Sequence, residues 1–251
     1  MLTGKNILVC ISGGIAAYKA ADIVSKLRKS KANVNVIMTE AATNFITPLT
    51  LRELSCNPVV VSMWEKVTNW NVEHIALASK ADLILMQLEI PMDTVEFVAK
   101  MASKKNKRVI LNPAPAQTLS ATLLRHLYMI TPNETEAEMI SGVKITDEVS
   151  AKKAAQVIME MGVQNVIVTL GSKGALIYCD SMVDMVPAIK VEAVDTTAAG
   201  DIFNGALTVA LAEGRDLREA VRFACKASAI SVTRVGAQSS APYRNEVDIF
   251  D

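Results

Sequence analysis

The chain has 251 residues, 26 basic and 26 acidic side chains and two histidines. A zero formal net charge without a dense basic patch argues against nucleic acid as a partner. No apolar run is long enough to span a membrane, and the N-terminal run "NILVCIS" is too short for a secretory signal, so we expect a cytoplasmic protein. The four cysteines form no CxxC pair, which predicts reduced thiols rather than a zinc site.

Strand and helix patterns alternate along the whole chain. Short apolar runs predict strands at residues 6–11, 34–38, 59–62, from 83, and at 109–111, 128–130, 165–170, 175–178 and 182–186. Helical periodicity predicts helices at 15–29, 47–54, 72–78, 92–103, 119–124, 134–140, 149–161, 199–212 and 217–234. This alternation predicts an α/β fold with a single doubly wound, Rossmann-like, three-layer and mostly parallel sheet.

A Gly-Gly turn joins the first predicted strand to the first predicted helix, in "ILVCISGGIAAYKAADIVSKL". Gly13 and Gly14 let backbone N–H groups approach a phosphate at the start of the helix. Thr39 follows the second strand, where it either offers a hydroxyl to a ligand or caps the next helix.

Three segments near the N-terminus, "GKNILVCISGGIAAYKAADIVSKLRK", "VNVIMTEAATNFITPLTLRELSCNPV" and "VEHIALASKADL", resemble the phosphopantothenoylcysteine decarboxylases, a flavodoxin-like, flavin-containing family. The resemblance implies a catalytic role for His74, although a lone histidine is more often structural. The family's Pro-Ala-Thr-Ala-Asn-Thr flavin loop and its substrate clamp are missing. The resemblance implies an FMN site formed by Ser12, Gly13, Gly14, Ile15, Thr39 and Phe45.

The C-terminal half contains a small-residue turn before a helix, in "VDTTAAGDIFNGALTVAL". Because Ala198, Ala199 and Gly200 have little or no side chain, their N–H groups can converge on an anion. Asp201 follows in the first helical turn, where it suits a general base beside a transferring phosphoryl group. Alternatively, Asp201 only stabilises the positive end of the helix dipole.

Together with "ITPNETEAEMISG", "VIVTLGSKGALIY" and "SVTRVGAQSSAPYR", this segment resembles the ribokinase family of carbohydrate kinases. The resemblance implies that Asp201 is the catalytic base and that residues 198–200 form the anion hole. Asn133 and Glu136 match a motif that organises magnesium and phosphate, although Asn-x-x-Glu is also a capping box. The other implied roles are nucleotide contacts for Thr169 and Gly171, a sugar contact for Glu89, and a monovalent cation site, such as one for K⁺, at Asp195, Thr197, Arg234, Gly236 and Ser240.

The sequence lacks two features of the kinase family, the N-terminal sugar anchor Gly-Gly-x-Gly-Ala-Asn and the small β lid. These two resemblances predict an engineered chimera of a decarboxylase-derived segment, 1–81, and a ribokinase-derived segment, 82–251, sharing one sheet. We expect its partner to be a small-molecule nucleotide or flavin, with residual binding of ATP and Mg²⁺ and little or no sugar phosphorylation. The alternatives are an FMN-binding module and an active ribokinase-like phosphotransferase, and a homo-oligomer is compatible with each.

Overall fold

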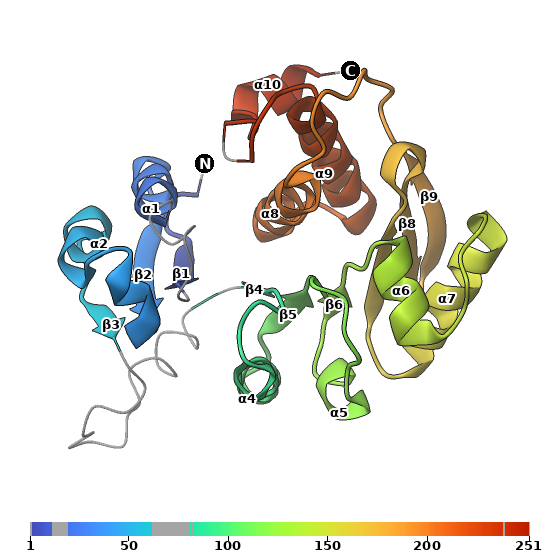
Figure 1. The fold of residues 1–251 in the computed structure, drawn as a ribbon, viewed down its shortest axis with the longest axis horizontal. Coiled ribbons are helices and arrows are strands. Elements are labelled where there is room, and N and C mark those ends of the chain that lie inside the picture. The colour runs from blue at the N-terminus through green and yellow to red at the C-terminus, as the bar shows by residue number, and fades with distance from the viewer. Residues whose placement is uncertain (1, 12–19, 62–80, 82, 238, 251) are drawn as a thin grey trace. The chain divides into compact units, whose positions relative to one another are not determined.

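A computed structural model describes residues 2–11, 20–61, 81, 83–237 and 239–250 (Figure 1). Contacts within the chain group it into two compact units. One unit comprises Met1–Ile84 with Lys104–Lys107, and the other comprises Leu85–Ser103 with Arg108–Asp251. The predicted helix at 72–78 lies outside the described residues, and so does most of the first βα turn.

The first unit is built on a three-stranded parallel sheet with the order β1-β2-β3. Val34 and Val36 of the central strand are fully buried, and both helices contact this strand and each other. The described elements are β1 (Asn6–Ile11), α1 (Ala20–Lys29), β2 (Asn33–Met38), the 3₁₀ helix η2 (Glu40–Asn44), α2 (Pro48–Ser55) and β3 (Val59–Val61).

The remaining strands form a second sheet of six strands in the order β4-β5-β6-β7-β8-β9. In Figure 1, α8 and α9 lie on one side of this sheet, and α4 and α5 lie on the other. The elements are β4 (Leu83–Met86), α4 (Met92–Lys104), β5 (Arg108–Leu111), α5 (Ala121–Leu124), β6 (Met129–Ile130), α6 (Glu134–Ser141), α7 (Glu148–Glu160), β7 (Asn165–Thr169), the 3₁₀ helix η3 (Gly171–Lys173), β8 (Gly174–Cys179), β9 (Met182–Pro187), α8 (Ala199–Ala212), α9 (Leu217–Val232) and α10 (Arg244–Ile249).

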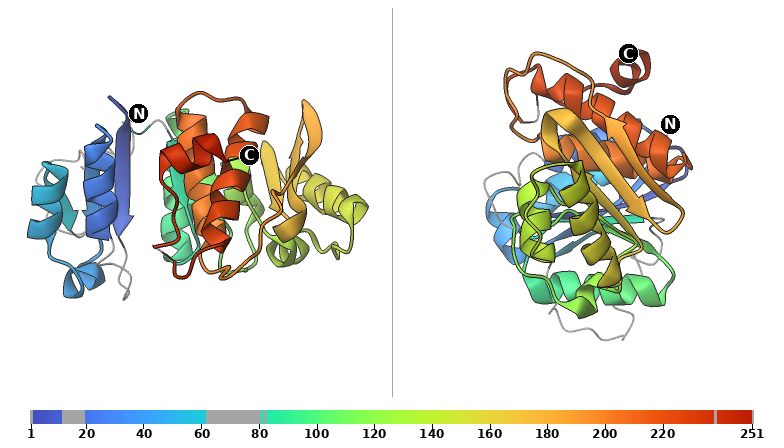
Figure 2. Two further views of the ribbon diagram at one scale, coloured as in Figure 1. Left: turned by 90° about the horizontal axis from the view of Figure 1, so that it is seen from above. Right: turned by 90° about the vertical axis from the view of Figure 1, so that its right-hand side faces the viewer.

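The prediction of a single sheet is wrong for the described strands. The first three strands pair only among themselves, and β4 pairs with β5 in the second sheet. The mostly parallel α/β character is confirmed, because β5, β6 and β7 pair in parallel. The short helix η3 joins the antiparallel strands β7 and β8, and β9 adds a further antiparallel strand at the end of the sheet (Figure 2).

The core of the second unit is apolar on both faces of its central strands. Ile110, Leu111, Met129, Ile130 and Ile167 are fully buried, which explains why these strands read as continuous apolar runs rather than alternating ones. The cysteines are free thiols, as expected. Among the described helices, none is long and apolar enough to cross a membrane.

Candidate functional site

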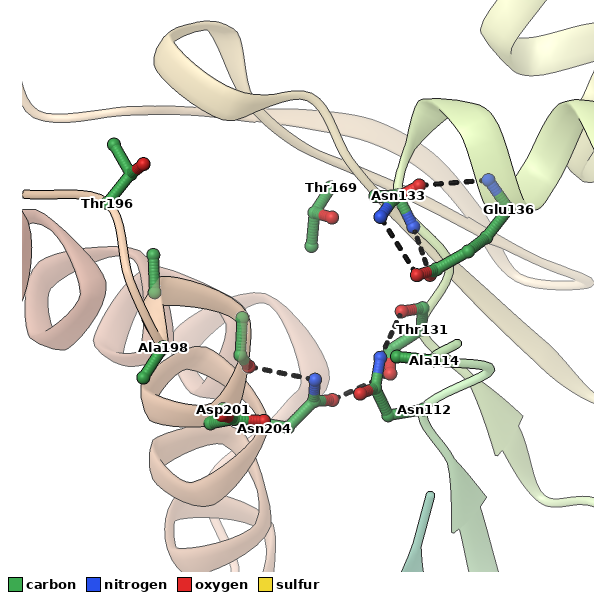
Figure 3. Close-up of a pocket in the computed structure, with 12 residues that line it drawn as sticks. Asn112, Ala114, Thr131, Asn133, Glu136, Thr169, Thr196, Ala198, Asp201 and Asn204 are labelled. Carbon is green, nitrogen blue, oxygen red and sulfur yellow. Dashed lines mark hydrogen bonds between the residues drawn. The ribbon is translucent and has the colours of Figure 1, made fainter. Parts of the chain in front are cut away.

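A pocket of about 240 Å³ opens at the carboxyl edge of the second sheet, between the strand ends and the start of α8 (Figure 3). Its lining comes from segments that are far apart in the sequence. The lining residues are Asn112, Ala114, Thr131, Asn133, Glu136, Thr169, Thr196, Ala198, Ala199, Gly200, Asp201 and Asn204.

The register of the parallel strands places one wall of this pocket. Leu111 pairs with Ile130, and Ile130 pairs with Val166, so the strands end at a common edge. Polar residues follow these ends directly, with Asn112 after β5 and Thr131 after β6. An isolated bridge then joins Asn133 to Thr169. Ligands bind at this edge in open α/β sheets, so the topology alone makes the edge a candidate site.

The opposite wall is the N-terminus of α8. Ala198, the N-cap residue, has φ +61° and ψ 13°, a left-handed conformation that costs a residue with a Cβ atom about 1–2 kcal/mol. Among the described residues, no side chain caps this helix. The N–H groups of Gly200 and Asp201 lie in the first turn and therefore lack intrahelical acceptors. This end of α8 can donate to an anionic ligand, which the helix dipole also favours.

Asn133 and Glu136 bond to each other at the start of α6. The backbone N–H and the side-chain amide of Asn133 donate to the two carboxylate oxygens of Glu136, each at 2.9 Å. In return, the backbone N–H of Glu136 donates to Oδ1 of Asn133 at 2.9 Å. The capping box predicted as an alternative is therefore present. Burial raises the pKa of Glu136, and the Asn133 backbone hydrogen bond partly offsets this rise.

A chain of buried polar side chains connects the strand ends to α8. Asn112, Thr131 and Asn204 are at most 7% exposed. The Asn112 amide donates to the carbonyl of Thr131 at 3.3 Å, and the Thr131 hydroxyl donates to Oδ1 of Asn204 at 2.6 Å. The Asn204 amide donates to the carbonyl of Gly200 at 2.9 Å (Figure 3). These bonds tie the first turn of α8 to the sheet.

The predicted cation residues lie outside the lining of this pocket, and three of them meet one another. Oδ1 of Asp195 accepts from the Thr197 N–H and Oδ2 accepts from the Gly236 N–H, each at 2.9 Å. The Thr197 hydroxyl and these two N–H groups lower the pKa of Asp195 to about 2. Arg234 pairs with Glu246, and the Ser240 hydroxyl donates to the carbonyl of Ala237 at 3.0 Å.

The other predicted site residues either do not line the pocket or lie outside the described residues. Gly171, with φ +55°, begins η3, and Glu89 is exposed after β4. His74 lies outside the described residues, as do Ser12, Gly13, Gly14 and Ile15.

Asn112, Thr131 and Asn204 were missed in the sequence, although the first two carry a usable signal. Each is a polar residue directly after a buried strand, the position at which ligands are met in parallel sheets. Asn204 gave no such signal, because it lies inside a helix and not after a strand.

An anion-binding helix end beside a carboxylate, at the carboxyl edge of a mostly parallel sheet, is typical of α/β proteins that bind phosphate esters. The model of the pfkB family of carbohydrate kinases matches residues 22–244. The chain therefore belongs to the pfkB carbohydrate kinase family.

The chain is similar to several ribokinases and to deoxyribokinases. The ribokinase of Haemophilus influenzae is 49% identical over 171 residues, covering 68% of this chain and 56% of that protein. The ribokinase of Schizosaccharomyces pombe is 36% identical over 98% of this chain and 79% of its own length. The ribokinase structure from Thermotoga maritima has a TM-score of 0.74 and 31% identity, covering 100% of this chain and 99% of its own. This chain spans about half the length of the curated ribokinases of Haemophilus influenzae, Staphylococcus aureus and Bacillus subtilis that it matches.

The prediction of a chimera is wrong. The family match begins at residue 22 and crosses the predicted boundary between segments 1–81 and 82–251 without a break. The Schizosaccharomyces pombe relative also aligns with almost the whole chain, and these matches give no sign of a decarboxylase-like N-terminal part. A Gly-Gly turn between a strand and a helix suits any βα unit, so this motif did not discriminate between families.

The predicted FMN site and the decarboxylase role of His74 rested on the decarboxylase resemblance, and both are wrong for the same reason as the chimera. Of the flavin candidates, Thr39 instead caps η2, since its hydroxyl accepts from the Ala42 N–H at 3.2 Å. The side chain of Phe45 is 48% exposed.

Proposed function

We propose that this chain is an active, ribokinase-like phosphotransferase that transfers the γ-phosphoryl group of ATP to a hydroxyl group of a pentose. The observation that carries this proposal is the common pocket. Seven residues with assigned kinase roles come from three separate parts of the sequence and line it together: Asn133, Glu136, Thr169, Ala198, Ala199, Gly200 and Asp201. The named relatives, ribokinases and a deoxyribokinase, support a pentose as the acceptor.

Asp201 is the proposed general base. Its carboxylate lies in the first turn of α8, next to the N–H groups that would hold the transferring phosphoryl group. Removing the proton from the attacking hydroxyl makes the oxygen a better nucleophile, and N–H groups fixed in place stabilise the charge that develops on the phosphoryl oxygens.

Asn133 and Glu136 would hold Mg²⁺ together with the phosphates. Among the described residues, no three His, Cys, Asp or Glu side chains gather into a metal cage. A single carboxylate beside a phosphate site fits Mg²⁺, which keeps several waters and is bound largely through substrate phosphates. The metal ion, when bound, neutralises charge on the phosphates.

The remaining assignments rest on the family resemblance. Thr169 and Gly171 are proposed to contact the nucleotide, and Glu89 to contact the sugar. The ionised carboxylate of Asp195 suits a monovalent cation site shared with Thr197, Arg234, Gly236 and Ser240, because its low pKa keeps it charged at neutral pH. The cytoplasmic location and a homo-oligomer stay predictions.

Phosphoryl transfer is tested by measuring ADP release with ATP, Mg²⁺ and ribose, and the same assay compares 2-deoxyribose, fructose and no sugar. We expect sugar-dependent release that falls by about 10²- to 10⁴-fold in kcat for Asp201→Asn. Asp180→Asn, in the exposed β8–β9 turn, is the matched control and should retain full activity. Sugar-independent release, or equal rates for wild type and Asp201→Asn, would contradict the proposal.

A further inference from the structure

The side chain of Gln87 connects the end of β4 to the carboxylate of Asp201. Its amide nitrogen donates to Oδ1 of Asp201 at 2.7 Å and to Oδ1 of Asn112 at 3.1 Å. Gln87 and Asp201 are 114 residues apart in the sequence. Gln87 is not among the residues that line the pocket, and the kinase resemblance gives it no role.

The backbone around Gln87 is fixed on both sides by the neighbouring strand segment. The Asn112 N–H donates to the carbonyl of Met86 at 2.9 Å, and the Leu88 N–H donates to the carbonyl of Ala114 at 2.9 Å. Met86 and Leu88 are both buried. The Cα atom of Gln87 is therefore held, and only its side-chain torsions remain to be set.

The hydrogen bonds of Asn112 set the orientation of the Gln87 amide. Because the Asn112 nitrogen donates to the Thr131 carbonyl, the oxygen of Asn112 is the atom that faces Gln87. That oxygen only accepts, so Gln87 must present its nitrogen rather than its oxygen. The same nitrogen carries a second hydrogen, and this hydrogen reaches Asp201. The buried network thus determines which Gln87 atom meets the carboxylate.

This arrangement gives the two oxygens of Asp201 different environments. Oδ1 accepts from Gln87, whereas in the part of the chain that the structure describes no group donates to Oδ2. A carboxylate bonded at one oxygen is restricted in its rotation about the Cβ–Cγ bond, and its other oxygen is available to accept a proton. A general base must lie within hydrogen-bond reach of the proton that it removes, so this orientation matters for transfer.

We infer that Gln87 is a positioning residue, which holds Oδ1 of Asp201 so that Oδ2 is the oxygen that accepts the proton of the acceptor hydroxyl. This inference rests on the proposed function, since it assigns the base role to Asp201. Gln87 itself touches neither substrate nor reacting atoms in this scheme. It acts on the reaction only through the base.

The kinetic test uses Gln87→Met, which has a similar length and no hydrogen-bond donor, and Gln87→Glu, which replaces the donor with an acceptor. We expect kcat to fall by about tenfold to a hundredfold for Gln87→Met, with KM for ATP unchanged, because a misplaced base affects transfer rather than nucleotide binding. We expect kcat to fall further for Gln87→Glu, since the new carboxylate would face the acceptor oxygens of Asn112 and Asp201. Gln156→Met removes an exposed glutamine–carboxylate bond on α7 and should leave kcat unchanged.

A second measurement does not depend on turnover. In a ¹H–¹⁵N spectrum of the full chain, the side-chain NH₂ signals of Gln87 are identified by their loss in Gln87→Met. We expect these signals to move in Asp201→Ala and to stay in place in Asp180→Ala. Signals that do not respond to Asp201→Ala would overturn the inference, and so would full kcat in Gln87→Met. If the signals respond but the wild type transfers no phosphoryl group, the contact with Asp201 is supported and the proposed function is contradicted.

Discussion

One wall of the pocket includes the N-terminus of α6 and the opposite wall is the N-terminus of α8, and these two helix ends are stabilised in opposite ways. Helix α6 starts with a complete capping box, in which Asn133 and Glu136 satisfy each other. Helix α8 starts at a left-handed alanine and, among the described residues, receives no side-chain cap. The first wall is therefore stabilised by its own neighbours in sequence, whereas the second leaves N–H donors for a ligand and depends on distant residues for its position.

This difference explains the buried polar chain behind α8. A helix end that keeps its donors free for a ligand forgoes the roughly 1 kcal/mol that a cap contributes. The bonds from Thr131 to Asn204 and from Asn204 to Gly200 hold that end in place without using its N–H groups. Changes at two positions of α8 should therefore have different effects, on ligand binding at Gly200 and on folding at Asn204.

The largest expected effect is at the uncapped wall, for Gly200→Asp compared with Gly200→Asn. A Cβ atom at this position meets nothing within 4 Å, so neither variant clashes at its Cβ atom. The aspartate would repel the phosphates by about 3 kcal/mol per charge pair at 5 Å and an effective dielectric of 20. We expect the Kd for ATP with Mg²⁺, measured by calorimetry, to rise at least about tenfold more for Asp than for Asn.

Thermal stability separates this effect from a folding defect. An acidic residue in the first turn is favoured by the helix dipole, so Gly200→Asp should unfold at the same temperature as Gly200→Asn or higher. Equal affinities for the two variants would show that α8 does not bind the phosphates, and the contrast between the two walls would then concern folding alone.

The next effect tests whether α8 depends on the buried chain. Asn204→Leu removes the 2.6 Å acceptor of the Thr131 hydroxyl and leaves it only the Leu111 carbonyl at 3.4 Å, so we expect a loss of about 1–3 kcal/mol in the free energy of unfolding. In Asn204→Leu with Thr131→Val, both partners are apolar, and part of this loss should be recovered. Urea denaturation of the two single variants and the double variant measures the coupling.

Additive losses in that cycle would mean that Thr131 and Asn204 do not act together. Thr135→Val is a control at an exposed threonine in the first turn of α6, the capped wall, and should change the unfolding free energy by less than about 0.5 kcal/mol.

Much of this fold could be predicted from local sequence. Helix α8 spans the predicted residues 199–212, and β1 spans the predicted 6–11, because apolar periodicity and the flanking turns determine both. The residues that position the site could not be found in this way. The Thr131–Asn204 bond joins residues 73 positions apart, and such a pairing follows only from strand order and register. The separate origin assigned to residues 1–81 was wrong for a related reason, since it rested on local motifs.

The smallest effect concerns two carboxylates, one near each wall. Both Glu136 and Asp195 accept hydrogen bonds from backbone N–H groups, yet their pKa values shift in opposite directions. Burial raises the pKa of Glu136, whereas donors from Thr197 and Gly236 lower the pKa of Asp195 to about 2. We expect opposite dependences of stability on pH, each measured as the difference in unfolding free energy between the wild type and Asp195→Asn or Glu136→Gln.

The sign of each dependence follows from which state binds the proton more tightly. The unfolded chain holds the Asp195 proton more tightly, so the stability contributed by Asp195 is complete above its ordinary pKa of 3.8 and is lost as pH falls towards about 2. The folded chain holds the Glu136 proton more tightly, so the wild type loses stability relative to Glu136→Gln as pH rises above 4.5. Difference curves with the same slope would contradict the contrast, because a single cause, either the hydrogen bonds or burial, would then govern both carboxylates.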